Sequence, residues 1–420
     1  MSRRDRAARA GAGYGPDPAT PFPAGEGGPG CQQHRPVPPF PAREGGPGRL
    51  GLARLAALES VAEPLAIFLA TRGCLLVLAY AATALLPRAA YAAKAWPFGG
   101  IFDPWVRWDS AWYLQIASEG YAYRPEAQTS TVAFFPLYPL LIRVAAPVLG
   151  SPVAAGLVIS NVALALALCC LYQLAARRFD RDVARRSALL LSCYPFAYFL
   201  GAVYTEGLFL LLAVAAFWLA ERRRWWLAGL AAGLAGATRL VGATLGPALG
   251  LLYLEQRRYH PREIRPDALA LGLAPLGLLA FALYQYLAFG DPFVTLKSAW
   301  GYYNLFEQGP GRLSPSGFGP GNYDLLLAVN LAAAVLWLLA VVPVFRLLGP
   351  AYATFVLLST LIPLSHQLES LGRFTSVLFP VFIVVAYHVR GRLSFSLLLS
   401  ASALLLSVLT VLFASGYPVV

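Results

Sequence analysis

The chain has 420 residues, of which 58% are hydrophobic and only 13% are charged. A soluble globular protein carries about 25% charged residues, so this composition excludes a soluble domain. The net charge of +12 does not indicate nucleic-acid binding, because the basic residues form short clusters between apolar runs, as in the cytoplasmic loops of membrane proteins. Long apolar runs without the alternation of barrel strands predict an all-α, polytopic integral membrane protein.

The first part of the chain, residues 1–55, is rich in proline, glycine and arginine, as in "GAGYGPDPATPFPAGEGGPG". Such a composition buries too little apolar surface to fold. It contains no apolar stretch followed by a cleavage site, so we do not interpret it as a signal peptide. We expect a disordered cytoplasmic tail, followed by a transmembrane domain over residues 56–420.

Eleven apolar segments follow and predict about 11 transmembrane helices: 64–87, 153–175, 187–203, 205–220, 226–238, 240–254, 267–289, 323–345, 350–365, 373–389 and 393–413. With the basic tail inside, most lysines and arginines fall on the cytoplasmic side, as the positive-inside rule requires. Two large loops, 88–152 and 290–322, then lie outside. This topology requires the apolar stretch 134–150 to lie at the outer interface and the pair 226–254 to form a short hairpin.

The first external loop contains "RWDSAWYLQIASEGY" (107–121). A helical periodicity places its polar and aromatic residues on two adjacent stripes: Asp109, Tyr113, Ile116 and Gly120 on one, and Trp108, Trp112 and Gln115 on the next. Tryptophan and tyrosine favour the headgroup region, so we expect a helix along the outer membrane surface with Asp109 near its start. Asp109 is then either a helix cap within an aromatic belt or a functional acid.

Several motifs occur in a fixed order: "RWDSAWYLQIASEGY", "AFFPLYPLLIR" (133–143), "ISN" (159–161), "YPFAYFLGAVYTEGLFL" (194–210), "ATRLVG" (237–242) and "LGRFTSVLFP" (371–380). Together they resemble the PIG-V family of mannosyltransferases, which belong to the GT-C class of lipid-linked-sugar glycosyltransferases. The resemblance extends from about residue 64 to residue 390. It implies GT-C architecture with interfacial helices in the first external loop, and transfer of mannose from a polyprenyl-phosphate donor. It also implies Asp109 as the catalytic base.

A single carboxylate is sufficient for transfer of a sugar from a lipid phosphate. A sugar on a lipid phosphate already has a good leaving group, so the second carboxylate of glycosidases is unnecessary. The reaction needs a base for the acceptor hydroxyl and cations to offset the departing phosphate. In-line displacement predicts inversion at the anomeric carbon. The expected partners are the polyprenyl-phosphate sugar, a lipid-linked or cell-surface acceptor and membrane lipids.

Two arginines are candidates for binding the donor phosphate. Arg373 lies where an external loop enters a predicted span, and Arg239 lies at the break of the short hairpin. A guanidinium in a membrane span is costly, and its fork geometry suits phosphate. The alternative for both is an arginine that extends to the lipid headgroups.

Five further residues are candidates for substrate binding. Glu206 would bind a sugar hydroxyl or pair with an arginine, unless it only favours the start of its helix. Arg143 would shape the donor groove or anchor in the headgroups. His366 would contact the phosphate or the acceptor, and Trp108 and Tyr113 accompany the acid in the first external loop.

We expect no cofactor or metal. Asp103 precedes Asp109 by six residues, but its position before a proline favours a turn. A divalent cation is conceivable in this enzyme class, but no ligand spacing indicates one. The loop 299–324 is interpreted either as an acceptor-binding lid or as a tolerant surface loop.

Three alternatives remain open on sequence alone. A transporter or flippase for lipid-linked sugars would also place charges within spans, and an assembly subunit would tolerate loss of Asp109. A protein O-mannosyltransferase usually has a second acid after the first, where this chain has Ser110. The arginine-rich, lysine-poor composition favours a bacterial cytoplasmic membrane, with the active site on the extracytoplasmic side.

Overall fold

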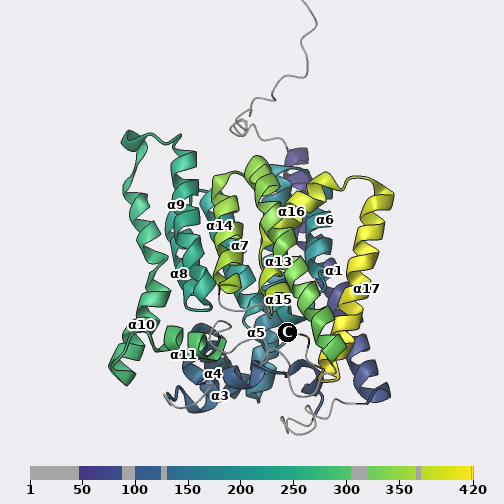
Figure 1. Ribbon diagram of the computed structural model, residues 1–420. Coiled ribbons are helices and arrows are strands. Elements are labelled where there is room, and N and C mark those ends of the chain that lie inside the picture. The colour runs from purple at the N-terminus through teal and green to yellow at the C-terminus, as the bar shows by residue number, and fades with distance from the viewer. Residues whose placement is uncertain are drawn as a thin grey trace, which may run out of the picture. The chain divides into compact units, whose positions relative to one another are not determined.

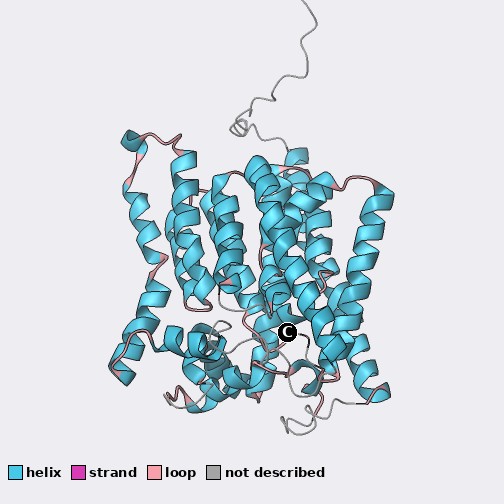
Figure 2. Ribbon diagram, viewed as in Figure 1, coloured by secondary structure: helices cyan, strands magenta, loops and turns pink. Residues whose placement is uncertain are grey.

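The computed structural model describes residues 47–87, 100–123, 130–303, 320–365, 370–417 and 419. These residues form helices and connecting loops, and none of them is in a strand (Figure 2). The all-α prediction is therefore confirmed. The α-helices are α1 (Pro47–Leu85), α3 (Ser110–Glu119), α4 (Leu137–Leu149), α5 (Pro152–Arg178), α6 (Arg181–Ser192), α7 (Glu206–Glu221), α8 (Trp225–Gly236), α9 (Leu245–Gln256), α10 (Leu276–Phe289), α11 (Val294–Tyr303), α13 (Pro320–Leu348), α14 (Pro350–Leu364), α15 (Leu371–Thr375), α16 (Phe379–His388) and α17 (Arg392–Ala414).

Short 3₁₀ helices connect several of these elements: η1 (Asp103–Trp105), η2 (Thr131–Ala133), η3 (Ala197–Leu200), η4 (Leu240–Thr244), η5 (Pro261–Glu263) and η6 (Pro266–Leu273). Backbone contacts divide the chain into Met1–Leu50 and Gly51–Val420, and the site described below belongs to the second unit. Residues 1–46 of the predicted tail lie outside the described residues. Its last part is helical, because leucine, alanine and arginine, all strong helix formers, dominate from residue 49 onward.

Four helical stretches among the described residues are long and apolar enough to cross a bilayer: Leu58–Leu85 of α1, α5, Leu327–Leu348 of α13, and α17. A fifth span results if η6 and α10, which are bent by 44° relative to each other, are counted together. The helices α4, α8, α14 and α16 are apolar but have only 10–17 residues. The chain is thus an integral membrane protein, and the count of about 11 spans stays a prediction.

The helices α3, α4 and α11 lie together at one end of the bundle, where α1 ends and α5 begins (Figure 1). The loops at 257–265 and 389–391, which carry predicted cytoplasmic basic residues, lie at the opposite end (Figure 1). With 13 residues, α4 is shorter than the roughly 20 residues of a bilayer span. This agrees with the expectation that residues 134–150 do not cross the membrane.

The apolar run 187–203, which the sequence predicts as one span, is not a continuous helix. α6 ends at Ser192, and residues 193–205 form an irregular segment that includes η3. Pro195 and Gly201 both disfavour helix in this stretch. Apolarity alone does not distinguish a helix from a buried irregular segment, so the predicted span is wrong here.

Side chains from two neighbouring helices satisfy the backbone of this irregular segment. Arg72 of α1 donates from Nη1 to the Ala197 carbonyl (2.9 Å) and from Nη2 to the Ser192 carbonyl (3.1 Å). Asn161 of α5 donates from Nδ2 to the Gly201 carbonyl (2.9 Å). Non-helical backbone at membrane depth is tolerated only where protein groups satisfy it. These contacts therefore hold the segment that leads into α7.

The predicted hairpin consists of α8 and α9, joined by η4. Gly242 packs so closely that a Cβ atom there would lie 2.4 Å from the Gly236 nitrogen. α10 crosses α8 at a similar distance, since a Cβ atom on Gly277 would lie 1.9 Å from the Gly233 carbonyl oxygen. Glycines at these positions allow the helices to approach closely, as is common in membrane proteins.

We expect Gly277→Ala to lower the free energy of unfolding by about 1–3 kcal/mol, because the added methyl group collides with backbone. Gly250→Ala in α9 is the control, since no atom lies within 4 Å of its added Cβ. Thermal unfolding in detergent measures both variants. A Gly277→Ala protein as stable as the wild type would contradict the close α8–α10 contact.

Candidate active site

Asp109 occupies the N-cap position of α3, but its carboxylate makes no capping hydrogen bond. Its Oδ2 instead accepts a hydrogen bond from Nη1 of Arg373 at 2.6 Å. The preceding residue, Trp108, has a φ of 50°, a conformation that bulky residues rarely adopt. Such strain is typical of functional sites. Asp109 is therefore not a side-chain cap of α3, and its role as a functional acid stays a prediction.

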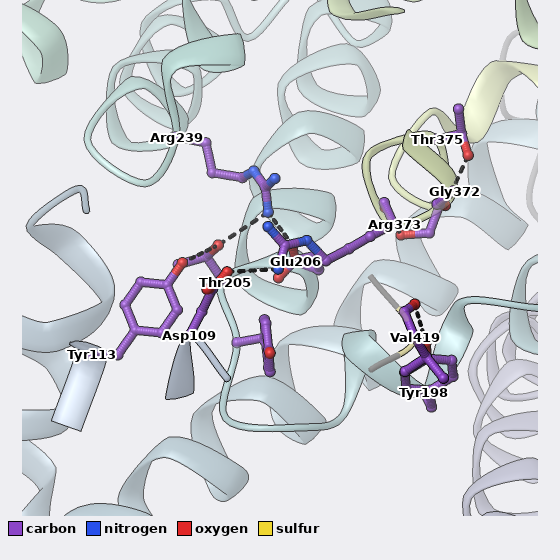
Figure 3. Close-up of polar contacts among 12 residues, drawn as sticks. Asp109, Tyr113, Tyr198, Thr205, Glu206, Arg239, Gly372, Arg373, Thr375 and Val419 are labelled. Carbon is purple, nitrogen blue, oxygen red and sulfur yellow. Dashed lines mark hydrogen bonds and ion pairs between the residues drawn. The ribbon is translucent and has the colours of Figure 1, made fainter. Parts of the chain in front are cut away.

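A second acid holds two arginines in place (Figure 3). Glu206, at the start of α7, is fully buried, and its Oε1 accepts a hydrogen bond from Nη1 of Arg239. The same Oε1 lies 3.1 Å from Nε of Arg373. With Asp109, two negative and two positive charges meet, which offsets the high cost of burying each one alone. Glu206 is therefore an arginine partner, one of the two functional roles predicted for it.

Aromatic rings surround both guanidinium groups. The guanidinium carbon of Arg373 lies 5.1 Å from the ring centroid of Phe374 and 5.4 Å from those of Phe199 and Tyr204. That of Arg239 lies 4.8 Å from the centroid of Phe374. Cation–π attraction strengthens where water is excluded, so these rings help fix the two cations.

The acid and the arginines line one cavity of about 180 Å³. Its charged and hydroxyl-bearing lining residues are Asp109, Tyr113, Thr205, Thr238, Thr295, Arg239 and Arg373, and its walls include Phe134, Phe135, Leu240, Val241, Ile362 and Pro363. Glu206 is not among the lining residues. The arginines thus lie between Glu206 and the cavity, so Glu206 positions them and does not face a ligand there.

Tyr113 supplies a hydroxyl group to this cavity. Its OH lies 3.4 Å from the Thr205 hydroxyl, which also accepts a hydrogen bond from Arg239 at 3.2 Å. Burial and the charges of Glu206 and Asp109 raise the pKa of Tyr113. The phenol therefore stays protonated near neutral pH and is available as a hydrogen-bond donor.

A second, largely apolar cavity of about 560 Å³ adjoins the first. Its walls come from α3, α4, α8 and α10, and Arg143 is the one charged residue among those that line it. Leu137 and Ala237 both line the second cavity. The Leu137 amide donates a hydrogen bond to the Ala237 carbonyl at 2.9 Å. Phe135, two residues before Leu137, and Thr238, next to Ala237, line the first cavity. The predicted stripe along α3 borders both cavities: Asp109 and Tyr113 line the first, and Ile116 and Gly120 line the second.

Four of the predicted residues thus share the first cavity: Asp109, Tyr113, Arg239 and Arg373. Arg143 lies instead in the second cavity, where its Nη2 donates to the Ser118 carbonyl at 3.2 Å. Trp108 lines neither cavity and packs against the core, and its predicted contact with substrate stays a prediction. Its place on the stripe beside Asp109 turns it away from the cavities. His366 lies outside the described residues.

Sequence reasoning missed Thr205 and Phe374. Each directly adjoins a predicted charged residue, in "YTEG" and "GRFT", and that adjacency was the available signal. Asp103 forms a buried ion pair with Arg107 at 3.0 Å. No group of three potential metal-ligating side chains occurs among the described residues.

We expect Glu206→Gln to destabilise the folded protein by about 3 kcal/mol, because it leaves two buried guanidinium groups with one fewer negative charge. Glu119→Gln, on the exposed end of α3, is the matched control and should stay within about 0.5 kcal/mol of the wild type. Thermal unfolding in detergent compares them. Equal unfolding midpoints for both variants would show that the arginines do not depend on Glu206.

Comparison with known proteins assigns the chain to a family. Residues 82–311 match the family described as Mannosyltransferase (PIG-V). GPI mannosyltransferase 2 of Drosophila pseudoobscura pseudoobscura is 36% identical over 24% of this chain and 24% of its own length. GPI alpha-1,6-mannosyltransferase 2 of Mus musculus is 28% identical over 57% of this chain and 52% of its own. The matched parts thus span about a quarter and about half of these relatives.

Among solved structures, ArnT from Cupriavidus metallidurans bound to undecaprenyl phosphate is 15% identical with a TM-score of 0.47, covering 80% of this chain and 62% of its own. The oligosaccharyltransferase of Archaeoglobus fulgidus is also 15% identical, with a TM-score of 0.43 and coverage of 84% and 56%. The family match covers more than half of the chain and confirms the resemblance in the sequence. This protein belongs to the PIG-V mannosyltransferase family.

Proposed function

We propose that this protein is a membrane mannosyltransferase that moves mannose from a polyprenyl-phosphate carrier to a lipid-linked or cell-surface acceptor. One observation carries the proposal: a carboxylate and two arginines line a cavity that adjoins a larger apolar one. Family membership favours a transferase over a transporter, a flippase or a non-enzymatic subunit.

The two cavities together suit an amphiphilic donor. The guanidinium groups of Arg239 and Arg373 match the planar, bidentate recognition of phosphate. Tyr113 and Thr205 are placed to bind sugar hydroxyls. The isoprenoid chain would lie in the apolar cavity, in van der Waals contact with its walls. Arg143 would stay near the lipid headgroups.

The reaction follows from this arrangement. The acceptor oxygen attacks the anomeric carbon while the bond from that carbon to the phosphate oxygen breaks. The acceptor proton passes to the Asp109 carboxylate, and the bonding electron pair leaves with the phosphate. Arg239 and Arg373 offset the charge that develops on it. Attack from the face opposite the phosphate inverts the anomeric configuration, and no cofactor takes part.

The ion pair between Asp109 and Arg373 gives donor binding a further role. Without a donor, the carboxylate is held by the guanidinium at 2.6 Å. A donor phosphate would compete for the same guanidinium and so release the carboxylate to accept a proton. Glu206, 3.1 Å from Nε of Arg373, would keep the arginine in place during this exchange of partners. The donor therefore binds before the acceptor reacts.

The site is proposed to face the extracytoplasmic side. It lies towards the end of the bundle that carries α3 and α4, opposite the basic loops at 257–265 and 389–391 (Figure 1), and basic loops favour the cytoplasm. The arginine-rich, lysine-poor composition supports a bacterial cytoplasmic membrane as the location.

We expect Asp109→Asn to reduce mannosyl transfer at least about 10²-fold, because an amide cannot accept the acceptor proton. The assay supplies polyprenyl-phosphate-mannose and a membrane lipid extract to the purified protein. Asp291→Asn removes the partner of Lys297; neither residue lines the cavity, so this variant should retain near-wild-type transfer. Transfer that survives Asp109→Asn would remove Asp109 as the base.

We expect Ala280→Phe to raise KM roughly tenfold for a long-chain donor, because the phenyl group fills the apolar cavity. A donor with a short, water-soluble chain should keep its wild-type KM. Ala401→Phe, on the exposed face of α17, is the control. An equal KM change for short and long chains would show that the cavity does not hold the isoprenoid.

A further inference from the structure

An arginine in the first span has an incompletely balanced charge. Arg72 lies within the spanning stretch of α1 and is only 8% exposed. It donates to the Ser192 and Ala197 carbonyls, but its Nε is buried and has no hydrogen-bond partner. Among the described residues, no carboxylate forms an ion pair with it. Burial of an unpaired charge in a span is costly and indicates a functional role.

The guanidinium of Arg72 borders a separate cavity of about 190 Å³ between α1 and α5. The cavity is lined by Arg72, Leu76, Tyr80, Phe102, Trp105, Leu157, Asn161 and Gly201. Leu76 and Phe102, which line it, are 46% and 40% exposed; Leu76 lies on the spanning stretch of α1, where an exposed apolar side chain faces lipid. The cavity thus joins an apolar, lipid-facing rim to one buried cation.

Gly201 keeps the approach to the cation open. A Cβ atom at this position would lie 3.0 Å from Oδ1 of Asn161 and 3.4 Å from Nη1 of Arg72. Asn161 donates to the Gly201 and Leu157 carbonyls, which fixes the floor of the cavity. These polar groups are held rigidly around a gap beside the guanidinium.

We propose that this cavity binds the phosphate group of an anionic membrane lipid, with Arg72 as its anion-binding residue. The backbone contacts at the end of α6 supply only part of a negative charge, whereas a phosphate supplies a full one and would accept a hydrogen bond from the guanidinium. The apolar side chains of Leu76 and Leu157 would contact the acyl chain, which favours a lipid over free phosphate.

The bound lipid would also brace the candidate active site. Trp105 in the cavity wall accepts a hydrogen bond from the Val203 amide at 3.3 Å. Their two segments continue to Asp109 and Glu206, respectively. The lipid site is distinct from the proposed donor cavities. Its test therefore does not depend on the proposed transfer reaction.

Native mass spectrometry of the purified protein tests the proposal through binding alone. Phosphatidylglycerol is compared with diacylglycerol of the same acyl chains, which lacks the phosphate. We expect the wild type to retain one phosphatidylglycerol and no diacylglycerol. Arg72→Gln should weaken phosphatidylglycerol binding at least about tenfold. Arg346→Gln, an exposed arginine at the end of α13, should leave it unchanged.

A second variant keeps the arginine and its structural bonds. Leu157→Trp fills the cavity from α5 and should cause a similar loss of phosphatidylglycerol. The proposal is overturned if the wild type retains both lipids equally, or if both variants bind phosphatidylglycerol as the wild type does. Binding of inorganic phosphate without retention of either lipid would likewise overturn the lipid assignment.

Discussion

The site depends on one electrostatic constraint: four charges must share a small, mostly buried volume. Glu206 is fully buried and anchors Arg239 and Arg373, and Arg373 in turn contacts Asp109. Each charge alone would cost several kcal/mol to bury, so the cluster forms only as a unit. Because Glu206 lies behind the arginines, it balances them without occupying the cavity, and the two cations and Asp109 remain available to a ligand.

Two of the four charged residues, Asp109 and Glu206, directly follow irregular segments of the fold. The regular helices of the bundle satisfy their own backbone, whereas in the stretch 193–205 the Ala197 and Gly201 carbonyls accept hydrogen bonds from Arg72 and Asn161. That stretch ends at Glu206. The irregular stretch 100–109, which includes η1, contains the buried pair of Asp103 and Arg107 and ends at Asp109. Glu206 thus follows a segment held by side chains from distant parts of the chain, and Asp109 follows one held by a local ion pair.

The sequence predicts the class of the protein and the identity of the acid, but not the geometry of the site. Composition is sufficient for the all-helical membrane class, and the order of motifs is sufficient for the family. The cost of charge in a span singles out Arg373 and Arg239, which the structure places in one cavity with Asp109. It could not reveal that Arg373 contacts Asp109 across 264 residues, because pairing depends on tertiary packing. Nor could apolarity alone show that the run 187–203 breaks after α6.

The most direct test of the account is an experimental map of the protein with a non-reactive polyprenyl-phosphate sugar bound. The account predicts the phosphate within hydrogen-bond distance of Arg373 and Arg239, the isoprenoid in the apolar cavity, and the Asp109 carboxylate facing the opposite side of the anomeric carbon. A phosphate bound away from both arginines, or a carboxylate that still pairs with Arg373 and cannot reach the sugar, would contradict it.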